Sequence, residues 1–267
     1  MTQPAETVRL DQAVVERGIL NSRTRAARAI ASGLVSIDGI VVRKASTPVA
    51  ASQIVFCDEH DQWVSRAAYK LEHAFRTWNI SVNDATVLDV GASTGGFTQV
   101  ALAHGARRVI ALDVGRDQLH PTIRNDDRVD VVEGENARYV TAERLAELSA
   151  SAPEISLVVS DVSFISLTMI IPALVQSVGA AAGYVFLVKP QFEVGRSGID
   201  GGIVRNATKR QAAIRDVVDC AIACGLTVSG LTLSPVSGEH GNIEAILYCD
   251  SNSPLDAREW SKIIESM

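Results

Sequence analysis

The feature that most constrains the fold is an apolar segment that runs directly into a glycine-rich turn, Thr86-Val-Leu-Asp-Val-Gly-Ala-Ser-Thr-Gly-Gly-Phe97. Residues 86–90 predict a buried parallel strand, and the periodic apolar run that starts at Phe97 predicts a helix that ends near Gly105. Glycines between a strand and a helix allow the backbone to approach a ligand closely. The segment therefore predicts one edge of a nucleotide-binding sheet, although a tight connection without a ligand would show the same pattern.

The spacing of this turn narrows the class of ligand. The glycines follow G-x-x-x-G-G, with Asp89 two residues before the first of them. Dinucleotide-binding turns follow G-x-G-x-x-G instead, and phosphate-binding loops end in Gly-Lys-Ser or Gly-Lys-Thr. A pyrophosphate prefers bare amides at a helix N-terminus, whereas an acid at the strand end suits a ligand that carries an ammonium and a sulfonium. The spacing therefore favours S-adenosylmethionine over NAD or ATP.

Further cofactor contacts are expected at the ends of later strands. Asp113 ends the next strand, where an acid commonly binds ribose hydroxyls, although this position alone does not exclude NAD. Asn136 follows the third strand and would lie near the adenine, but a loop cap explains it equally well. The expected cofactor contacts are Asp89, Gly91, Ser93, Thr94, Gly95, Gly96, Phe97, Asp113, Asn136 and Asp161.

Strand and helix patterns alternate from residue 86 to residue 249, which predicts a parallel sheet with helices on both faces. The expected strands are residues 86–91, 108–114, 129–133, 156–161, 184–189, 227–233 and 243–249, and the last two should be adjacent and antiparallel. A helix from Ser65 to about Trp78 precedes them. We expect an α/β, Rossmann-like fold of the class I methyltransferase type, with a seven-stranded, mainly parallel sheet.

Composition limits the partners of such a chain. The 267 residues are 47% hydrophobic, enough for a full core and a small accessory module. The four cysteines contain no C-x-x-C pair and the five histidines no ligand pattern, so we expect reduced thiols and no metal. No leader pattern or membrane-spanning stretch is evident, and the short apolar run at 167–175 contains Pro172, which predicts a core helix. We expect a cytoplasmic protein without a membrane partner, as a monomer or weak dimer.

A small module of its own is predicted at residues 1–60, joined by a linker at 61–65 to the larger domain at 66–267. Two short helices should be followed by strands, with a hairpin turn at Asp38-Gly39. Although the net charge of the chain is −6, residues 17–44 hold six cations against one acid. Such a local basic face can bind phosphate, or it can be merely a solvated surface. The expected RNA contacts are Arg23, Arg25, Arg28, Arg43, Lys44 and Arg66.

The pattern L-D-x-x-V-V-E-R-G, followed by S-R-T-x-A-x-x-x-I-x-x-G-x-V-x-I-D-G, closely resembles the S4 RNA-binding domain over residues 8 to about 58. This resemblance implies an α+β fold and an RNA partner for the N-terminal module.

Charged residues stand at strand ends in the larger domain, where ligand crevices lie in such sheets. Asp161 follows one apolar strand, and Lys189-Pro190 ends the next. For Asp161 and Lys189 alone a structural ion pair is as good an explanation as catalysis. Because Pro190 ends its strand, Lys189 should project from the rim where a substrate would sit.

Lys70, Asp161, Lys189 and Glu244 match the Lys-Asp-Lys-Glu tetrad of RNA ribose 2'-O-methyltransferases with the FtsJ/RrmJ-like fold. Together with the S4 module, S-D-V-S-F-I-S and V-K-P-Q-F-E-V-G, the chain is similar to the bacterial TlyA family, known both as hemolysins and as rRNA cytidine-2'-O-methyltransferases. The resemblance implies that ribosomal RNA, 16S or 23S, or a ribosomal subunit is the substrate. It further implies that Lys189 is the general base, that Asp161 and Lys70 position and polarise the reacting groups, and that Glu244 supports these residues.

Rival interpretations leave signatures that can be checked. An exocyclic-amine methylase would carry Asp/Asn-Pro-Pro-aromatic near position 161, and a cytosine C5 methylase would need a nucleophilic cysteine at a strand end. A pseudouridine synthase can carry an S4 module but gives the glycine turn no role. The remaining alternatives are a membrane-active cytolysin and a non-catalytic S4-type RNA-binding protein.

Overall fold

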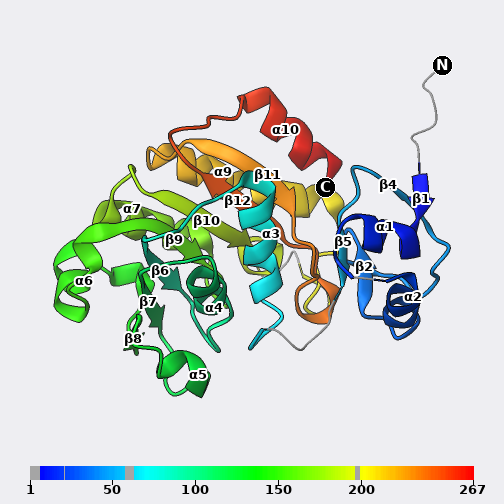
Figure 1. Ribbon diagram of the computed structural model, residues 1–267. Coiled ribbons are helices and arrows are strands. Elements are labelled where there is room, and N and C mark those ends of the chain that lie inside the picture. The colour runs from blue at the N-terminus through cyan, green and yellow to red at the C-terminus, as the bar shows by residue number, and fades with distance from the viewer. Residues whose placement is uncertain (1–6, 21, 58–62, 196–198) are drawn as a thin grey trace.

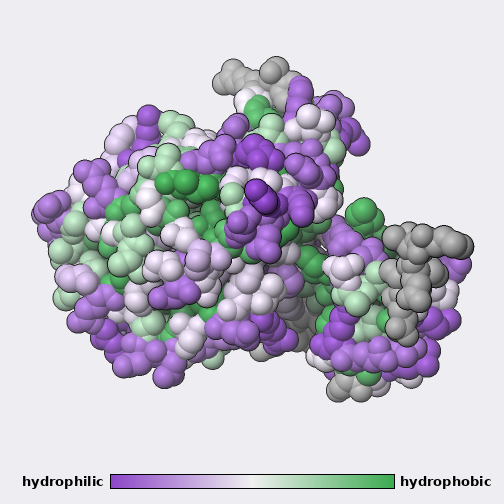
Figure 2. Space-filling model, turned by 90° about the horizontal axis from the view of Figure 1, so that it is seen from above, coloured by the Kyte–Doolittle hydropathy of each residue, from purple (hydrophilic) through white to green (hydrophobic). Residues whose placement is uncertain are grey.

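The computed structural model describes residues 7–20, 22–57, 63–195 and 199–267, which form a small N-terminal unit and a larger α/β unit (Figure 1). Seen from above, the two units are separate lobes with a groove between them (Figure 2). The N-terminal unit contains β1 (Thr7–Arg9), α1 (Leu10–Glu16), α2 (Arg23–Ala31), β2 (Val35–Ile37), β3 (Ile40–Val41), β4 (Pro48–Ala50) and β5 (Val55–Cys57). The first residues of the linker expected at 61–65 lie outside the described residues.

Local sequence explains the N-terminal unit. Ser22 caps α2, because its side chain accepts a hydrogen bond from the backbone N–H of Arg25. Asp38 and Gly39, both with positive φ, join β2 to β3 in the two-residue hairpin that the sequence predicts. Apolar side chains of α1, α2 and the strands form one small core. The β1–β4 pair was not predicted, because each strand has only three residues.

The larger unit is built on the predicted seven-stranded sheet. Its strands are β6 (Thr86–Val90), β7 (Arg108–Asp113), β8 (Val129–Glu133), β9 (Ile155–Ser160), β10 (Gly183–Val188), β11 (Val228–Leu233) and β12 (Ala245–Cys249). Their order is β11-β12-β10-β9-β6-β7-β8, and β12 runs antiparallel to both of its neighbours while the other pairs are parallel. The expectation of a mainly parallel sheet with an antiparallel end is confirmed.

Helices cover both faces of this sheet (Figure 1). They are α3 (Ala68–Trp78), α4 (Gly96–Ala103), α5 (Pro121–Arg124), α6 (Ala142–Leu148), α7 (Ile171–Val178), α8 (Pro190–Glu193), α9 (Ala207–Ala223) and α10 (Ala257–Ser266), with 3-10 turns η1 (Ala137–Tyr139), η2 (Ala152–Glu154), η3 (Leu167–Met169) and η5 (Glu239–Gly241). Successive strand residues point to opposite faces, so Val87 belongs to the core that includes residues of α3 and α4, whereas Leu88 belongs to the core that includes residues of α6, α7, α9 and α10.

Two helices differ from their predicted bounds. The helix expected from Ser65 begins at Ala68, because residues 65–67 form tight turns that bond three residues ahead rather than four. The helix expected at 167–175 is divided into η3 and α7, and Pro172 lies in the first turn of α7, where its missing N–H costs no helical bond. Within the described residues, no helix is long and apolar enough to cross a membrane.

Candidate active site at the strand ends

The carboxyl ends of β6, β9 and β10 meet at one edge of the sheet, because these three parallel strands are neighbours. The glycine-rich turn follows β6, Asp161 follows β9 and Lys189 follows β10. A cavity of about 210 Å³ lies there, lined by Ser65, Ala67, Gly91, Ala92, Ser93, Thr94, Gly96, Phe97, Asp161, Ser163 and Lys189. The structure thus brings the predicted turn and two of the four predicted catalytic residues to one cavity.

The four predicted catalytic residues form two ion pairs. Lys189 Nζ lies 2.6 Å from Asp161 Oδ1, and Lys70 Nζ lies 2.6 Å from Glu244 Oε2. The first pair lines the cavity, whereas the second is buried behind it, with Lys70 8% and Glu244 2% exposed. Lys189 also donates a hydrogen bond to Ser163 Oγ at 2.8 Å.

Strand register explains why Glu244 reaches this place. Ala245 pairs with Val188 across the antiparallel β10–β12 ladder, so the residue before β12 and the residue after β10 are neighbours. Gly238 leaves room for the carboxylate of Glu244 in its present position, since a Cβ at residue 238 would overlap Glu244 Oε1. Gln191 Nε2 holds the same oxygen at 3.2 Å.

The charges around Lys70 keep it protonated. Burial lowers the pKa of Lys70, but the carboxylates of Glu244 and then Asp161 raise this pKa by more, so it lies above its ordinary value. Lys70 is therefore a fixed positive charge at neutral pH. Of the two lysines, Lys189 is the one that lines the cavity, so it is the one that can contact a substrate there.

Asp89 lies in β6 and not at its exposed end. The side chain is fully buried on the face covered by α4, where Thr98 Oγ1 donates to Asp89 Oδ2 at 2.6 Å. Burial raises the pKa of Asp89 to about 7. Its other oxygen, Oδ1, has no hydrogen-bond partner among the described residues. Ser65 Oγ, Ser160 Oγ and Gln191 Oε1 are likewise buried and unpaired within that part of the chain. Such a group of unsatisfied polar atoms at the strand ends suits a polar ligand.

The turn itself is shaped partly by protein packing. A Cβ on Gly91, where φ is +84°, would lie 2.8 Å from the carbonyl oxygen of Asp161, so this glycine allows the ends of β6 and β9 to approach each other. Gly95, with φ of +92°, faces Leu119 and Ile123, and Gly96 faces Ser65 and the start of α3. Gly95 does not line the cavity, so its role is to shape the turn.

Asp113 and Asn136 are used in local hydrogen bonds. Asp113 accepts from the backbone N–H groups of Ser93 and Gly115 at 2.8 and 2.7 Å, which ties the glycine turn to the end of β7. Asn136 accepts from the backbone N–H of Arg138 and so caps η1, which is the loop-capping role that its position also predicted. Contacts of Asn136 and Asp113 with a cofactor remain predictions.

The predicted RNA-contacting cations divide between surfaces. Arg23 donates to Asp11 at 2.8 Å and shares a shallow depression with Arg28, whereas Arg25 lines a different cavity between the two units. All three arginines are exposed on α2, but they border two different surfaces, and their contacts with RNA remain predictions. Arg43 and Arg66 each donate to a backbone carbonyl, those of Ala31 and Ser237. Lys44 is exposed at the edge of the unit.

Sequence reasoning missed three residues beside Lys189. Phe164 is 88% exposed with a φ of +65°, and its ring lies 5.1 Å from that of Phe192, which in turn lies 6.0 Å from Lys189 Nζ. Glu193 accepts hydrogen bonds from Ser166 Oγ and from the backbone N–H of Leu167, the latter at 2.9 Å. All three lie in the motifs that the sequence singled out, but their roles depend on tertiary contacts.

Comparison with known proteins gives one consistent result. A family model described as FtsJ-like methyltransferase matches residues 63–250, and an S4 domain model matches residues 8–55. The 16S/23S rRNA (cytidine-2'-O)-methyltransferase TlyA of Mycobacterium tuberculosis is 42% identical over 91% of this chain and 90% of its own. Hemolysin A of Brachyspira hyodysenteriae is 39% identical over 90% of this chain and 99% of its own. A solved structure from Streptococcus thermophilus, provisionally described as a hemolysin, has a TM-score of 0.71 and 35% identity and covers 98% of this chain and 96% of its own.

Proposed function

The chain belongs to the FtsJ-like methyltransferase family and carries an S4 domain, and from this we propose that it transfers a methyl group from S-adenosylmethionine to a ribose 2'-hydroxyl of ribosomal RNA, with cytidine as the target nucleoside. The observation that supports this most is the assembly of Lys70, Asp161, Lys189 and Glu244 as two ion pairs beside the cavity of the glycine turn. The name of the M. tuberculosis relative supports the choice of ribosomal RNA and cytidine.

The residues of the cavity fit this cofactor. S-adenosylmethionine, when bound, supplies a methyl group on a positively charged sulfur, which leaves as a neutral thioether. The carboxylate of Asp161 lines the cavity and would favour that positive charge, the buried carboxyl group of Asp89 lies in the adjacent strand β6, and Gly91 and Ser93 of the turn also line the cavity.

The chemical task of the protein is to position the hydroxyl and to accept its proton, because a ribose 2'-hydroxyl is a poor nucleophile at neutral pH. Lys189 can accept this proton only as a neutral amine, so its ammonium must first release a proton to water; the amine Nζ would then accept the hydroxyl proton as the hydroxyl oxygen forms its bond to the methyl carbon and the methyl–sulfur bond breaks. Asp161 and Ser163 hold Lys189 in place, and Lys70 contributes a fixed positive charge, paired with Glu244, behind them.

Phe164 supports an RNA substrate. An exposed aromatic ring beside a reactive lysine offers a face on which an unpaired base can stack, and stacking on aromatic side chains is common in the recognition of single-stranded RNA. A positive φ at a bulky residue is strained, and such strain is found most often at functional sites. We infer that Phe164 receives the target base.

The test is a Lys189→Ala variant. Turnover with ribosomal RNA and radiolabelled cofactor should fall by about 10²–10⁴-fold, as is typical when a general base is removed, while cofactor affinity measured by calorimetry should change little. Lys262→Ala, at an exposed position of α10, serves as the control and should retain full activity. Methylation by Lys189→Ala within a few-fold of the wild type would rule out the proposed role.

A further inference from the structure

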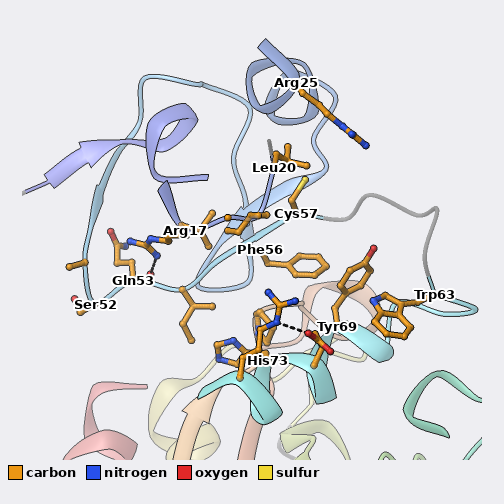
Figure 3. Close-up of a pocket in the computed structure, with 18 residues that line it drawn as sticks. Arg17, Leu20, Arg25, Ser52, Gln53, Phe56, Cys57, Trp63, Tyr69 and His73 are labelled. Carbon is orange, nitrogen blue, oxygen red and sulfur yellow. Dashed lines mark hydrogen bonds and ion pairs between the residues drawn. The ribbon is translucent and has the colours of Figure 1, made fainter. Parts of the chain in front are cut away.

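A second and larger cavity, of about 740 Å³, lies between the two units (Figure 3). Its walls come from β5 and the neighbouring loops of the N-terminal unit on one side and from α3 on the other. This volume is within the range of about 300–1,000 Å³ that is usual for ligand sites. The catalytic residues do not line this cavity, so its occupant is not explained by the methyl transfer itself.

Aromatic rings from both units meet in this cavity. Phe56 of β5 and Tyr69 of α3 lie edge to face, with ring centroids 4.8 Å apart, and Trp63 precedes α3 beside Tyr69 (Figure 3). His73, one helical turn after Tyr69, also lines the cavity, and burial lowers the pKa of its imidazole to about 4. At neutral pH His73 is therefore uncharged and adds a further flat, polar ring to the wall.

Arginines surround these rings. Arg17, Arg25 and Arg76 line the cavity together with a single acid, Glu72, among the described residues. Arg17 is held in place by the carbonyl oxygens of Gln53 and Ala50, at 2.5 and 2.9 Å. Arg76 is paired with Glu72, and the Arg76 side chain is 72% exposed; Glu72, 14% exposed, also pairs with His104 Nε2 at 2.7 Å and so keeps a partner when Arg76 moves away. The guanidinium of Arg76 can thus turn to a phosphate at little cost.

The segment from Trp63 to Tyr69 forms a wall shared by the two cavities. Trp63 and Tyr69 line the cavity between the units, whereas Ser65 and Ala67 line the catalytic cavity. The catalytic cavity and the aromatic cavity are therefore separated by this one short segment.

We propose that the cavity between the units binds one unpaired nucleotide of the RNA substrate, with its base against Phe56, Trp63 and Tyr69 and with Arg25 and Arg76 near different phosphates of the strand. Flat rings with adjacent guanidinium groups are the combination that binds single-stranded RNA, because every base has a stacking face and every nucleotide a phosphate. The identity of the RNA rests on the proposed function, but the binding chemistry does not.

The probe is a ten-nucleotide single-stranded RNA, with a duplex of the same sequence as comparison. Trp63→Ala should weaken binding of the single strand by about 5- to 150-fold, the range found when one stacking aromatic is removed, whereas Trp63→Phe should retain most of the affinity. Arg76→Ala should lower the slope of log K against log salt by about 0.7, as expected when one phosphate of a single strand is no longer neutralised. Arg258→Ala, at an exposed position of α10, is the matched control and should leave the salt slope unchanged.

Two results would overturn the proposal. One is wild-type affinity for the single strand in both Trp63→Ala and Arg76→Ala, with unfolding temperatures that show the variants to be folded. The other is an equal reduction of single-strand and duplex binding, since only an unpaired base can enter the cavity. Methylation is measured separately: if the wild type binds the oligonucleotide through Trp63 but labels no ribosomal RNA, the proposed function fails and the nucleotide site stands.

Discussion

Asp89 lies in an environment that disfavours its charged form. Its carboxyl group is fully buried, and one of its oxygen atoms has no hydrogen-bond partner among the described residues. Burial raises its pKa from 3.8 to about 7. An acid whose pKa is higher in the folded than in the unfolded chain stabilises the fold most below pH 4, and this contribution, on the order of 4 kcal/mol, is lost as pH rises to about 7. A cation bound near Asp89 would favour the ionised carboxylate and would therefore lower the pKa of Asp89.

Cofactor affinity should therefore depend on pH. Because the bound sulfonium favours the ionised form of Asp89, the affinity of the wild type for S-adenosylmethionine should rise by up to about tenfold between pH 6 and pH 8, with release of a proton below pH 7. Calorimetry in buffers of different ionisation enthalpy measures both quantities. Asp89→Asn should bind with little dependence on pH, and a wild-type affinity that is equal at pH 6 and pH 8 would contradict the account.

Individual residues differ in how far the sequence predicts them. The meeting of Asp161 and Lys189 is predictable, because both follow apolar strands directly and parallel strand ends meet at one edge, whereas Lys70 and Glu244 were identified only by resemblance. The packing role of Gly95 is not, since its neighbours Leu119 and Ile123 come from a segment 24 or more residues later. The exposure of Phe164 likewise depends on the left-handed backbone at that residue, which no local pattern indicates.

At the scale of elements, Glu193 connects the two segments that carry Asp161 and Lys189. Its carboxylate, in α8, accepts hydrogen bonds from Ser166 and Leu167, in the loop that follows Asp161 and Ser163. The same short helix begins directly after Lys189. Burial raises the pKa of Glu193, because the site is largely shielded from water. We infer that Glu193 is a positioning residue that fixes Lys189 relative to Asp161.

Glu193→Ala should lower kcat by roughly 10- to 100-fold, since misplacement of reacting groups by about 1 Å can lower the rate by that factor. Cofactor affinity and KM for RNA should stay within a few-fold of the wild-type values. Glu193→Gln should recover much of the rate, because its amide can accept from the Leu167 N–H and donate to Ser166 Oγ. Steady-state kinetics and unfolding temperatures are to be measured together. A folded Glu193→Ala variant with the wild-type kcat would show that the two segments are positioned by other contacts.

Elements were predicted best where their sequence pattern is long. All seven strands of the large sheet lie within a residue or two of the expected bounds, because each is an apolar run that ends in a turn signal. The three-residue strands β1 and β4 and the short helices α5 and α8 were not predicted, since so few residues show no period. The division at Ile170 between η3 and α7 also depends on packing, because propensity alone favours one helix there.

At the scale of the whole molecule, the net charge of −6 is unevenly distributed, because residues 17–44 of the N-terminal unit hold six cations against one acid. Arg23 and Arg28 border a shallow depression on α2 that is separate from the cavity at Arg25. Asp11 neutralises part of the charge of Arg23, which leaves Arg28 as the stronger phosphate contact of the two. The N-terminal unit thus has two separate basic surfaces on one helix, and we expect both to contact RNA.

The double variant Arg23→Ala/Arg28→Ala should weaken binding of ribosomal RNA to a similar degree for all sequences. The slope of log K against log salt should fall by about 0.9 for each duplex phosphate that an arginine no longer neutralises, while cofactor affinity stays unchanged. Salt titrations of RNA binding measure this, with Arg25→Ala studied separately because it lines the other surface. An unchanged slope in the double variant would mean that these arginines are only a solvated face.

The central claim is the chemistry of the methyl transfer, and nucleoside mass spectrometry tests it most directly. Ribosomal RNA from cells that lack the gene is incubated with the protein and with S-adenosylmethionine that carries a deuterated methyl group, then digested to nucleosides. The account predicts a 2'-O-methylcytidine that carries the deuterated methyl group, and no such product with Lys189→Ala. A label on a base, or no label with folded wild-type protein on either RNA or intact subunits, would contradict it.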